Sequence, residues 1–283
     1  MTSRSDRRTA MFSALCGAAM IAATSASAQE TITIATEGAY APWNFVNAQG
    51  QLEGFEIDLA EELCTRAELE CEIVSQDWDG IIPSLVAKKY DAIMAGMNIT
   101  PTRKETIDFT QPYAGGPHGF MVMDDSDLVE LPKGEYSLTV DEAGTEAAIE
   151  ELKPMFDGKI IGVQGSTTNS NFAEKYFADV AEIRLYKTTE QHDLDLAAGR
   201  IDAALAAHSA FKATIDGPSG DGMVVVGPAF SGGLLGLGVA VGLRQEDTEL
   251  RDKLDAAITS AKEDGVIEEL SMKWFGIDMT PKS

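Results

Sequence analysis

The sequence has 283 residues and is strongly acidic, with 46 Asp and Glu against 22 Lys and Arg and a formal net charge of −24. Its 44% of hydrophobic residues can form a packed core, which excludes a disordered acidic polymer. The acidic surplus argues against nucleic acid as a partner, because a duplex is neutralised by clustered Lys and Arg, and against docking on anionic lipid. The three Cys and three His are scattered, so we predict no metal site and no cofactor.

Residues 1–28 have the pattern of a secretory signal peptide. A basic start with Arg4, Arg7 and Arg8 precedes an apolar stretch, and Ala26-Ser-Ala28 forms a small-x-small cleavage site. The apolar stretch is shorter than the roughly 20 residues that a membrane span needs. We therefore expect an exported chain that begins at Gln29 and does not insert into the membrane.

Strands and helices alternate along the first half of the mature chain. Apolar residues at 55, 59 and 63 lie on one helical face, and a period of two marks the first strand. The pattern predicts strands at 31–35, 71–74 and 91–94 and helices at 55–63 and 81–89. This order indicates a parallel sheet covered by helices.

A second series with the same order begins after Gly115-Gly-Pro117. It predicts strands at 159–163, 182–186 and 201–205 and helices at 169–177 and 190–199, followed by two C-terminal helices around Gly265. We therefore expect an α/β fold of two lobes around a cleft, joined by two glycine-rich crossings. The expected division is lobe 1 at 29–117, lobe 2 at 118–229 and a return to lobe 1 at 230–283.

Cys64 and Cys71 lie where a helical pattern changes to a strand pattern. In an oxidising compartment they can join the helix end to the strand start, and so short a loop contributes about 2–3 kcal/mol. The alternative is two buried free thiols, because a sequence does not establish the geometry of a bridge. A catalytic thiol is disfavoured, since no His is near in sequence.

A series of motifs carries a family resemblance. They are Thr36-Glu-Gly-Ala-Tyr-Ala-Pro-Trp43, Gly54-Phe-Glu-Ile-Asp-Leu59, Trp78-Asp-Gly-Ile-Ile-Pro-Ser-Leu85, Thr100-x-x-Arg103, Phe109-Thr-Gln-Pro-Tyr113, Gly162-Val-Gln-Gly-Ser-Thr167 and Ala198-Gly-Arg-Ile-Asp-Ala203. Over essentially the whole mature chain this resembles the periplasmic solute-binding proteins of the polar amino-acid class. It is most similar to the lysine/arginine/ornithine- and histidine-binding branch, which shares the seven-spaced Cys pair. Residues 187–200 resemble the octopine- and nopaline-binding members.

The resemblance implies a type II periplasmic binding protein, in which two parallel-rich sheets with helices are joined by a two-segment hinge. We expect the hinge near 114–118 and 230–238. Such a protein is a monomer in the periplasm, closes on an amino acid or opine, and delivers it transiently to an inner-membrane ABC permease. No cofactor is implied.

The family clamps the ligand α-carboxylate with an arginine, which here is Arg103. A planar guanidinium suits this task because it offers two parallel donors to two oxygens. The turn Gln164-Gly-Ser-Thr lies between a strand and a helix start, where free backbone N–H groups form an anion site. Ser166, Thr167 and Thr168 therefore join the expected carboxylate site, although Ser166 and Thr167 can also be ordinary N-caps.

The other end of the ligand is expected at Glu37, Tyr40 and Trp78. Glu37 falls where receptors for basic amino acids carry an acidic residue that meets the distal cation. Trp78 offers an aromatic face to a guanidinium or ammonium, worth roughly 0.5–2 kcal/mol.

Departures from the branch favour a larger ligand with a second carboxylate. The acidic residue that usually holds the α-ammonium is replaced by Ala207, which His208 follows. Ala95 and Gly96 replace a pair of serines and enlarge the cavity, and Asn98 follows them. His118 at the hinge adds a further donor, although either His could instead be a wall residue without a ligand role. These changes suit an opine, which is arginine joined to a keto acid, over free arginine.

Three alternatives stay open. The first is a receptor for arginine, lysine, ornithine or histidine proper. The second is an enzyme, because cyclohexadienyl dehydratases resemble these receptors, but no Ser/His/Asp or nucleophilic Cys constellation is visible. The third is a sensor subunit that presents its ligand to a membrane kinase.

Overall fold

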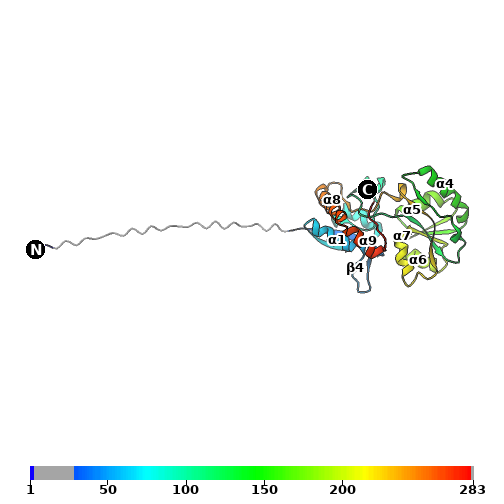
Figure 1. Ribbon diagram of the computed structural model, residues 1–283, viewed down its shortest axis with the longest axis horizontal. Coiled ribbons are helices and arrows are strands. Elements are labelled where there is room, and N and C mark those ends of the chain that lie inside the picture. Colours follow the sequence, from blue (N-terminus) through cyan, green and yellow to red (C-terminus); the bar gives the residue numbers. More distant parts are fainter. Residues whose placement is uncertain (3–28, 282–283) are drawn as a thin grey trace.

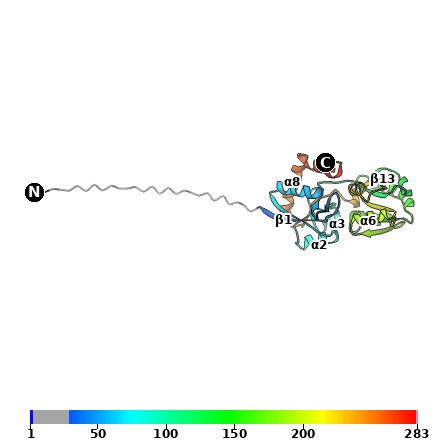
Figure 2. The same ribbon diagram turned by 90° about the horizontal axis from the view of Figure 1, so that it is seen from below.

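Two β-sheets organise the chain, each in a lobe of its own (Figures 1 and 2). The computed structural model describes residues 1–2 and 29–281. The signal peptide expected at 1–28 therefore lies, apart from its first two residues, outside the described part. No helix in the described part has the length and apolar character to cross a bilayer.

The first sheet has the strand order β5-β1-β6-β14-β7. Strands β5, β1 and β6 are parallel, whereas β14 is antiparallel to both of its neighbours. The strands are β1 (Glu30–Thr36), β5 (Leu69–Ser75), β6 (Ala92–Ile93), β7 (Asp108–Phe109) and β14 (Gly242–Leu243). The helices of this lobe are α1 (Phe55–Arg66), α2 (Ile81–Val86), α3 (Pro101–Lys104), α8 (Thr248–Glu263) and α9 (Val266–Phe275), with a short 3₁₀ turn η1 (Trp78–Gly80).

The second sheet has the order β11-β10-β12-β8-β13-β9. Strands β11, β10 and β12 are parallel, and β8 is antiparallel to β12 and β13. The strands are β8 (His118–Met123), β9 (Glu135–Ser137), β10 (Ile160–Gln164), β11 (Glu182–Tyr186), β12 (Ala203–Ala207) and β13 (Met223–Ser231). The helices are α4 (Glu142–Leu152), α5 (Thr168–Phe177), α6 (Thr189–Ala197) and α7 (His208–Asp216), with 3₁₀ turns η2 (Asp127–Glu130), η3 (Lys153–Phe156) and η4 (Gly233–Leu235). Figure 1 shows α4 to α7 grouped in this lobe, away from α1 and α8, with α7 next to α9 of the first lobe.

A small antiparallel sheet of β2 (Ala39–Tyr40), β3 (Asn44–Val46) and β4 (Leu52–Glu53) extends the first lobe. The two sheets and their helices confirm the expected α/β architecture. The helix expected at 81–89 is shorter, because α2 ends at Val86 and Lys88 adopts a left-handed φ of 60°. The strand expected at 201–205 begins two residues later, at Ala203.

The chain crosses between the lobes twice. The first crossing leads into β8 at His118, and the second follows β13, which continues to Ser231. Ala114 and Val239 form an antiparallel bridge, so the two crossings lie side by side at the edge of the first lobe. The lobe boundaries and hinge segments stay predictions, but the strands narrow the second crossing to the residues between 231 and 239.

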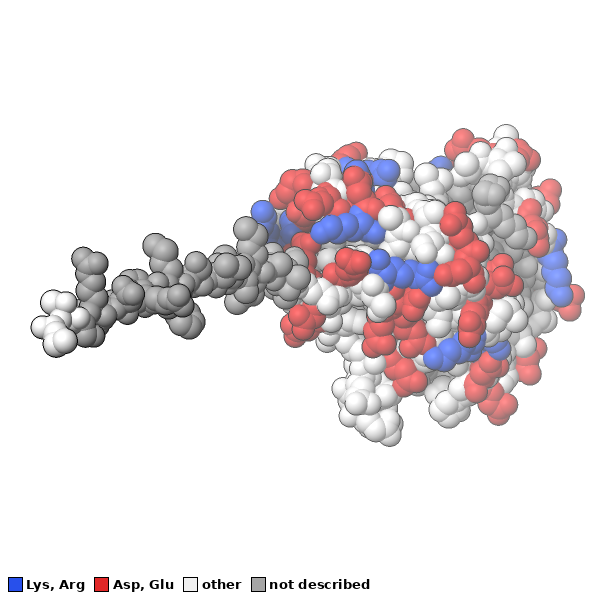
Figure 3. All heavy atoms as spheres, turned by 60° about the vertical axis from the view of Figure 1, so that its left-hand side comes forward, with Lys and Arg blue, Asp and Glu red and all other residues white. Residues whose placement is uncertain are grey.

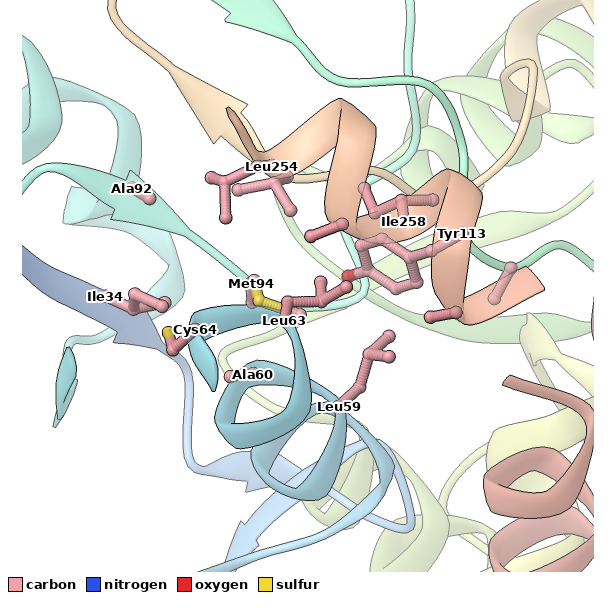
Figure 4. Packing of buried hydrophobic residues seen from close by; sticks show 14 of the residues in the cluster. Ile34, Leu59, Ala60, Leu63, Cys64, Ala92, Met94, Tyr113, Leu254 and Ile258 are labelled. Carbon is pink, nitrogen blue, oxygen red and sulfur yellow. The ribbon is translucent and has the colours of Figure 1, made fainter. Parts of the chain in front are cut away.

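The core of the first lobe forms between α1, α8 and the sheet. Phe55, Leu59 and Leu63, the face predicted for α1, are fully buried. Figure 4 shows Leu59 and Leu63 on one side of Tyr113, with Ile258 of α8 beside it. Burying one such side chain contributes about 1.5–3 kcal/mol, so this core fixes α1 against the C-terminal helices.

The bridge expected between Cys64 and Cys71 is present, with their Cα atoms 6.2 Å apart. Cys64 lies in α1 and Cys71 in β5, so the bridge joins the helix to the adjacent strand, as the sequence predicts.

Acidic side chains are spread over the visible face of the protein instead of forming one patch, and several Lys and Arg lie among them (Figure 3). Surface ion pairs include Lys159 with Asp127 at 2.8 Å and Lys212 with Asp216 at 2.6 Å. Exposed pairs of this kind contribute little stability. On this face the acidic charge is distributed instead of concentrated in one patch, and a surplus of one sign favours solubility.

Candidate functional site

A small cavity lies between the lobes, with about 30 Å³ open to the centres of water-sized spheres. Most of the residues expected to bind ligand line it. The first lobe contributes Glu37, Tyr40, Trp78, Ala95, Gly96, Asn98 and Arg103. The second lobe contributes His118, Gln164, Thr167 and Thr168. The structure thus brings together side chains that are more than a hundred positions apart in the chain.

Arg103 lies in the short helix α3, whose N-cap Thr100 accepts a hydrogen bond from the backbone N–H of Arg103 at 3.2 Å. Its Nη1 donates to the backbone oxygen of Asn98 at 2.8 Å, and its guanidinium lies 5.2 Å from the centre of the Trp78 ring. Burial lowers the pKa of Arg103 to about 10, so the group stays charged at neutral pH. No carboxylate in the described part of the chain lies within 4.0 Å of it. This cation is available to an anionic ligand.

The turn after β10 presents the start of α5 to the cavity. Thr167 caps the helix by accepting a hydrogen bond from the N–H of Ser170 at 3.1 Å, and the Ser170 hydroxyl accepts one from the N–H of Thr167 at 3.1 Å. This reciprocal capping leaves N–H groups of the first turn for an anion. The N-cap interpretation is therefore confirmed for Thr167, and it is compatible with carboxylate binding at the same turn.

Glu37 follows β1 and is almost fully buried. Its Oε1 accepts a hydrogen bond from Nε2 of Gln164 in the other lobe at 2.7 Å. Burial raises the pKa of Glu37 to about 7, and Glu56 is the next group that raises it. Across residues 29–281, no Lys, Arg or His lies within ion-pair distance of Glu37. A cationic ligand group would supply the missing partner.

The lobes are in direct contact around the cavity. Nε1 of Trp78 donates to the backbone oxygen of Ser166 at 3.1 Å, in addition to the bond between Glu37 and Gln164. Further from the cavity, Nε1 of the buried Trp43 donates to Oγ of Ser209 at 3.1 Å. These bonds describe a closed arrangement of the two lobes.

His118 is buried at the start of β8, and its Nδ1 lies 2.8 Å from Oδ1 of Asn169. Burial lowers the pKa of His118 to about 4, so the ring is neutral near pH 7. With the amide oxygen of Asn169 as acceptor, Nδ1 carries the proton and Nε2 is an acceptor. His118 lines the cavity with its Nδ1 engaged by Asn169, and its ligand role stays a prediction.

Two expected site residues do not line the cavity. Ser166 offers its backbone oxygen to Trp78 and has a left-handed φ of 59°, so its contribution is to the turn. His208 lies at the start of α7, where its N–H donates to the oxygen of Pro117 at 3.0 Å. Its ring packs over Gly119, since a Cβ there would lie 2.3 Å from Nε2 of His208. Ligand roles for both residues stay predictions.

Comparison with known proteins places this geometry in a family. The family model of bacterial extracellular solute-binding proteins, family 3, matches residues 32–277. The chain is 47% identical to the octopine-binding periplasmic protein of Rhizobium meliloti, over 95% of this chain and 98% of that one. It is 36% identical to the histidine-binding periplasmic protein of Escherichia coli (strain K12), over 90% and 91% of the two chains.

A solved structure shows the same architecture. The crystal structure of a periplasmic His/Glu/Gln/Arg/opine family-binding protein from Silicibacter pomeroyi in complex with lysine matches with a TM-score of 0.71. The two chains are 36% identical, and the match covers 89% of this chain and all of the other. The chain belongs to the family 3 solute-binding proteins.

The cavity of this solute-binding protein contains four residues that the sequence did not single out as ligand contacts. They are Asn169, Thr189, Leu205 and Ala206. Thr189 lies within residues 187–200, which resemble the opine-binding proteins. That motif could have pointed to Thr189 as a residue of the cavity. Asn169 carried no signal of its own, because its contact with His118 joins two segments 51 positions apart.

The described residues of the solute-binding protein contain no group of three or more His, Cys, Asp or Glu that could hold a metal ion. Arg103, Glu37 and the polar lining residues supply the charged and hydrogen-bonding groups of the cavity. Together they offer one cation, one carboxylate and several neutral hydrogen-bonding groups around a single cavity.

Proposed function

We propose that this solute-binding protein captures an arginine-derived opine of the octopine or nopaline type for an ABC importer. One observation carries the proposal. Arg103 and Glu37 line the same cavity, and in the described chain neither has an oppositely charged partner within 4.0 Å. A ligand with a carboxylate and a guanidinium would give each of these two side chains an oppositely charged partner. Buried charges need such partners or hydrogen bonds.

An opine is preferred to free arginine because the second lobe has Ala207 where an acidic residue would hold a primary ammonium. Ala207 is buried and pairs with His118 in the sheet. Its methyl side chain offers no acid to a primary ammonium. A buried ammonium without such a partner would lose an interaction of about 1.5–3 kcal/mol. An opine carries a second carboxylate on that nitrogen, and the polar groups of Asn98 and Asn169 line the cavity to meet it. The similarity to a protein named as octopine-binding supports the same preference.

Closure of the lobes is the proposed mechanism of capture. Ligand contacts with both lobes would add to the direct bonds from Trp78 to Ser166 and from Glu37 to Gln164. A ligand shifts the equilibrium only through its differential contacts with the closed form. At a hundredfold excess over its Kd it should add about 2.7 kcal/mol to the apparent stability.

We further propose that the protein acts as a monomer in the periplasm and transfers its ligand to an inner-membrane permease without chemical change. Of the described residues that line the cavity, Glu37 alone is a carboxylate. A dehydratase needs a pocket acid, and Glu37 is committed to the ligand cation. Turnover of prephenate or arogenate by the purified protein would contradict this proposal.

Calorimetry of the mature protein should show tighter binding of octopine or nopaline than of arginine, lysine or histidine. The expected advantage over arginine is about tenfold or more, the size of one charge-assisted hydrogen bond. Arginine binding at least as tightly as either opine would instead identify a basic amino-acid receptor.

The affinity for cationic ligands should fall as the pH is lowered below about 7. Burial raises the pKa of Glu37 to about 7, and only the ionised carboxylate pairs with a cation. Each pH unit below that value reduces the ionised fraction about tenfold. His118 does not titrate in this range, since burial lowers its pKa to about 4. Calorimetry between about pH 5 and pH 8 measures the profile, and a flat profile would contradict the role of Glu37.

A further inference from the structure

Glu56 is a buried carboxylate outside the cavity that no ligand contact explains. It lies in the first turn of α1 and its side chain is fully buried. No Lys, Arg or His in the described chain lies within ion-pair distance of it. A buried acidic group without a cation needs another source of stabilisation or becomes protonated.

The surroundings of Glu56 consist of hydrogen-bond donors. The amide Nδ2 of Asn44 donates to Oε2 at 2.6 Å, and the N–H of Gly96 lies 2.7 Å from Oε1 and 3.0 Å from Oε2. The hydroxyl of Tyr113 donates to Oε1. The orientation of the Asn44 amide is set independently, because its Oδ1 accepts from the N–H of Gly38 at 2.8 Å.

A protonated carboxyl group could donate only to the Tyr113 hydroxyl, since the Asn44 NH₂ and the Gly96 N–H are donors only. An ionised carboxylate only accepts, so all three partners match the charged form. The position in the first turn of α1 adds the favourable end of the helix dipole. Burial is the largest effect and raises the pKa of Glu56, and the three hydrogen bonds offset that rise only in part. The geometry, in which three donors meet the two carboxyl oxygens, fits the anion.

Glu56 lies directly behind the wall of the binding cavity. Gly96, to which it is bonded, lines that cavity and has a left-handed φ of 61°. A Cβ at Gly96 would lie 2.8 Å from Cε1 of Tyr40, so the wall is thin and closely packed at this point. Through Asn44 the carboxylate also holds the turn at Gly38, next to Glu37.

We propose that Glu56 is an ionised carboxylate behind the cavity wall that determines selectivity for the guanidinium or ammonium end of the ligand. It acts through the wall, by its negative charge and by positioning Gly96 and the turn that carries Glu37. The inference rests on the proposed function, since it assigns a residue to the cationic end of the same site. Glu37 is the carboxylate that lines the cavity at this end, and Glu56 adds to the negative potential there.

The test compares Glu56→Gln with Glu61→Gln, an exposed residue of the same helix. Arginine and octopine are the cationic probes, and citrulline is the neutral isostere of arginine. Glu56→Gln should weaken both cationic probes about tenfold, the order expected for a charge acting through a few ångströms of protein, and citrulline much less. Glu61→Gln should match the wild type.

The pH profile of arginine binding separates a charge effect from a purely structural one. Removing the charge of Glu56 should lower the pKa of Glu37 and move the midpoint of the profile to lower pH. Asp77 and Asp79, which also raise the pKa of Glu37, are unchanged in the variant, as is Tyr40. Equal losses for arginine and citrulline with an unmoved midpoint would overturn the proposal.

A measurement on the wild-type protein covers the case in which Glu56→Gln does not fold. Carbon-13 NMR of glutamate-labelled protein should show the Glu56 carboxyl in its ionised form at neutral pH. A protonated Glu56 would overturn the proposal whatever the ligand. If instead the wild type binds none of the arginine-type ligands, the proposed function fails, whereas normal binding with an unchanged Glu56→Gln profile rejects only this inference.

Discussion

Replacing Arg103 with Ala should abolish measurable binding of every carboxylate ligand, with a loss of affinity of at least about a hundredfold. Two charge-assisted hydrogen bonds from one guanidinium are worth about 3 kcal/mol or more together, and a factor of ten corresponds to about 1.4 kcal/mol. The guanidinium is already held in place by Asn98 and by the Trp78 ring, so little ordering opposes binding. Calorimetry with octopine and arginine measures the loss.

Two further variants define the control for this experiment. Arg103→Lys keeps the charge but loses the planar fork, so it should recover only part of the affinity. Arg184→Ala removes a surface guanidinium that pairs with Glu182 at 2.7 Å, and it should leave binding unchanged. Near-normal affinity in Arg103→Ala would show that the carboxylate clamp lies elsewhere, with the turn at Thr167 as the next candidate.

Replacing Glu37 with Gln should weaken cationic ligands by about ten- to a hundredfold, while neutral amino acids are little affected. A hydrogen bond to a charged group contributes about 1.5–3 kcal/mol, and its loss is specific to ligands that carry the cation. Gln is nearly isosteric, and its amide oxygen can still accept from Nε2 of Gln164, so the closed arrangement is retained. The comparison of arginine with citrulline by calorimetry measures the selectivity.

The same variant should also remove the dependence of affinity on pH near 7. Because the folded-state pKa of Glu37 is raised to about 7, its ionisation destabilises the fold as the pH rises through that value, and a bound cation offsets this. Glu30→Gln, at the exposed start of β1, is the matched control and should retain the wild-type profile. Equal losses for arginine and citrulline in Glu37→Gln would argue against a cation site.

Much of the fold follows from local patterns in the sequence. The alternating apolar residues of β1 and the stripe at Phe55, Leu59 and Leu63 are buried where they were expected. The strand predicted at 182–186 has those bounds in the structure. Such elements are predictable because burial of one face imposes a period of two or of about 3.6 residues on the chain.

The charged ends of the site were also accessible from the sequence, because Arg103 and Glu37 lie in motifs that resemble a known family. The sequence could not show that neither residue has an oppositely charged partner in the described chain. Whether a buried guanidinium or carboxylate is paired depends on every segment that packs around it, and those segments are distant in the chain. The contact between Glu37 and Gln164, for example, spans 127 positions.

The sequence by itself determined the α/β class and the order of elements, and it placed the Cys pair, Arg103 and Glu37 in recognisable motifs. These features depend on periodicity, spacing and residue type. The tertiary structure alone decided that His208 lies over Gly119 outside the cavity lining and that Glu56 meets three donors behind Gly96. Hydrogen bonds of that kind join side chains by direction and distance in space, which no local pattern of the chain encodes.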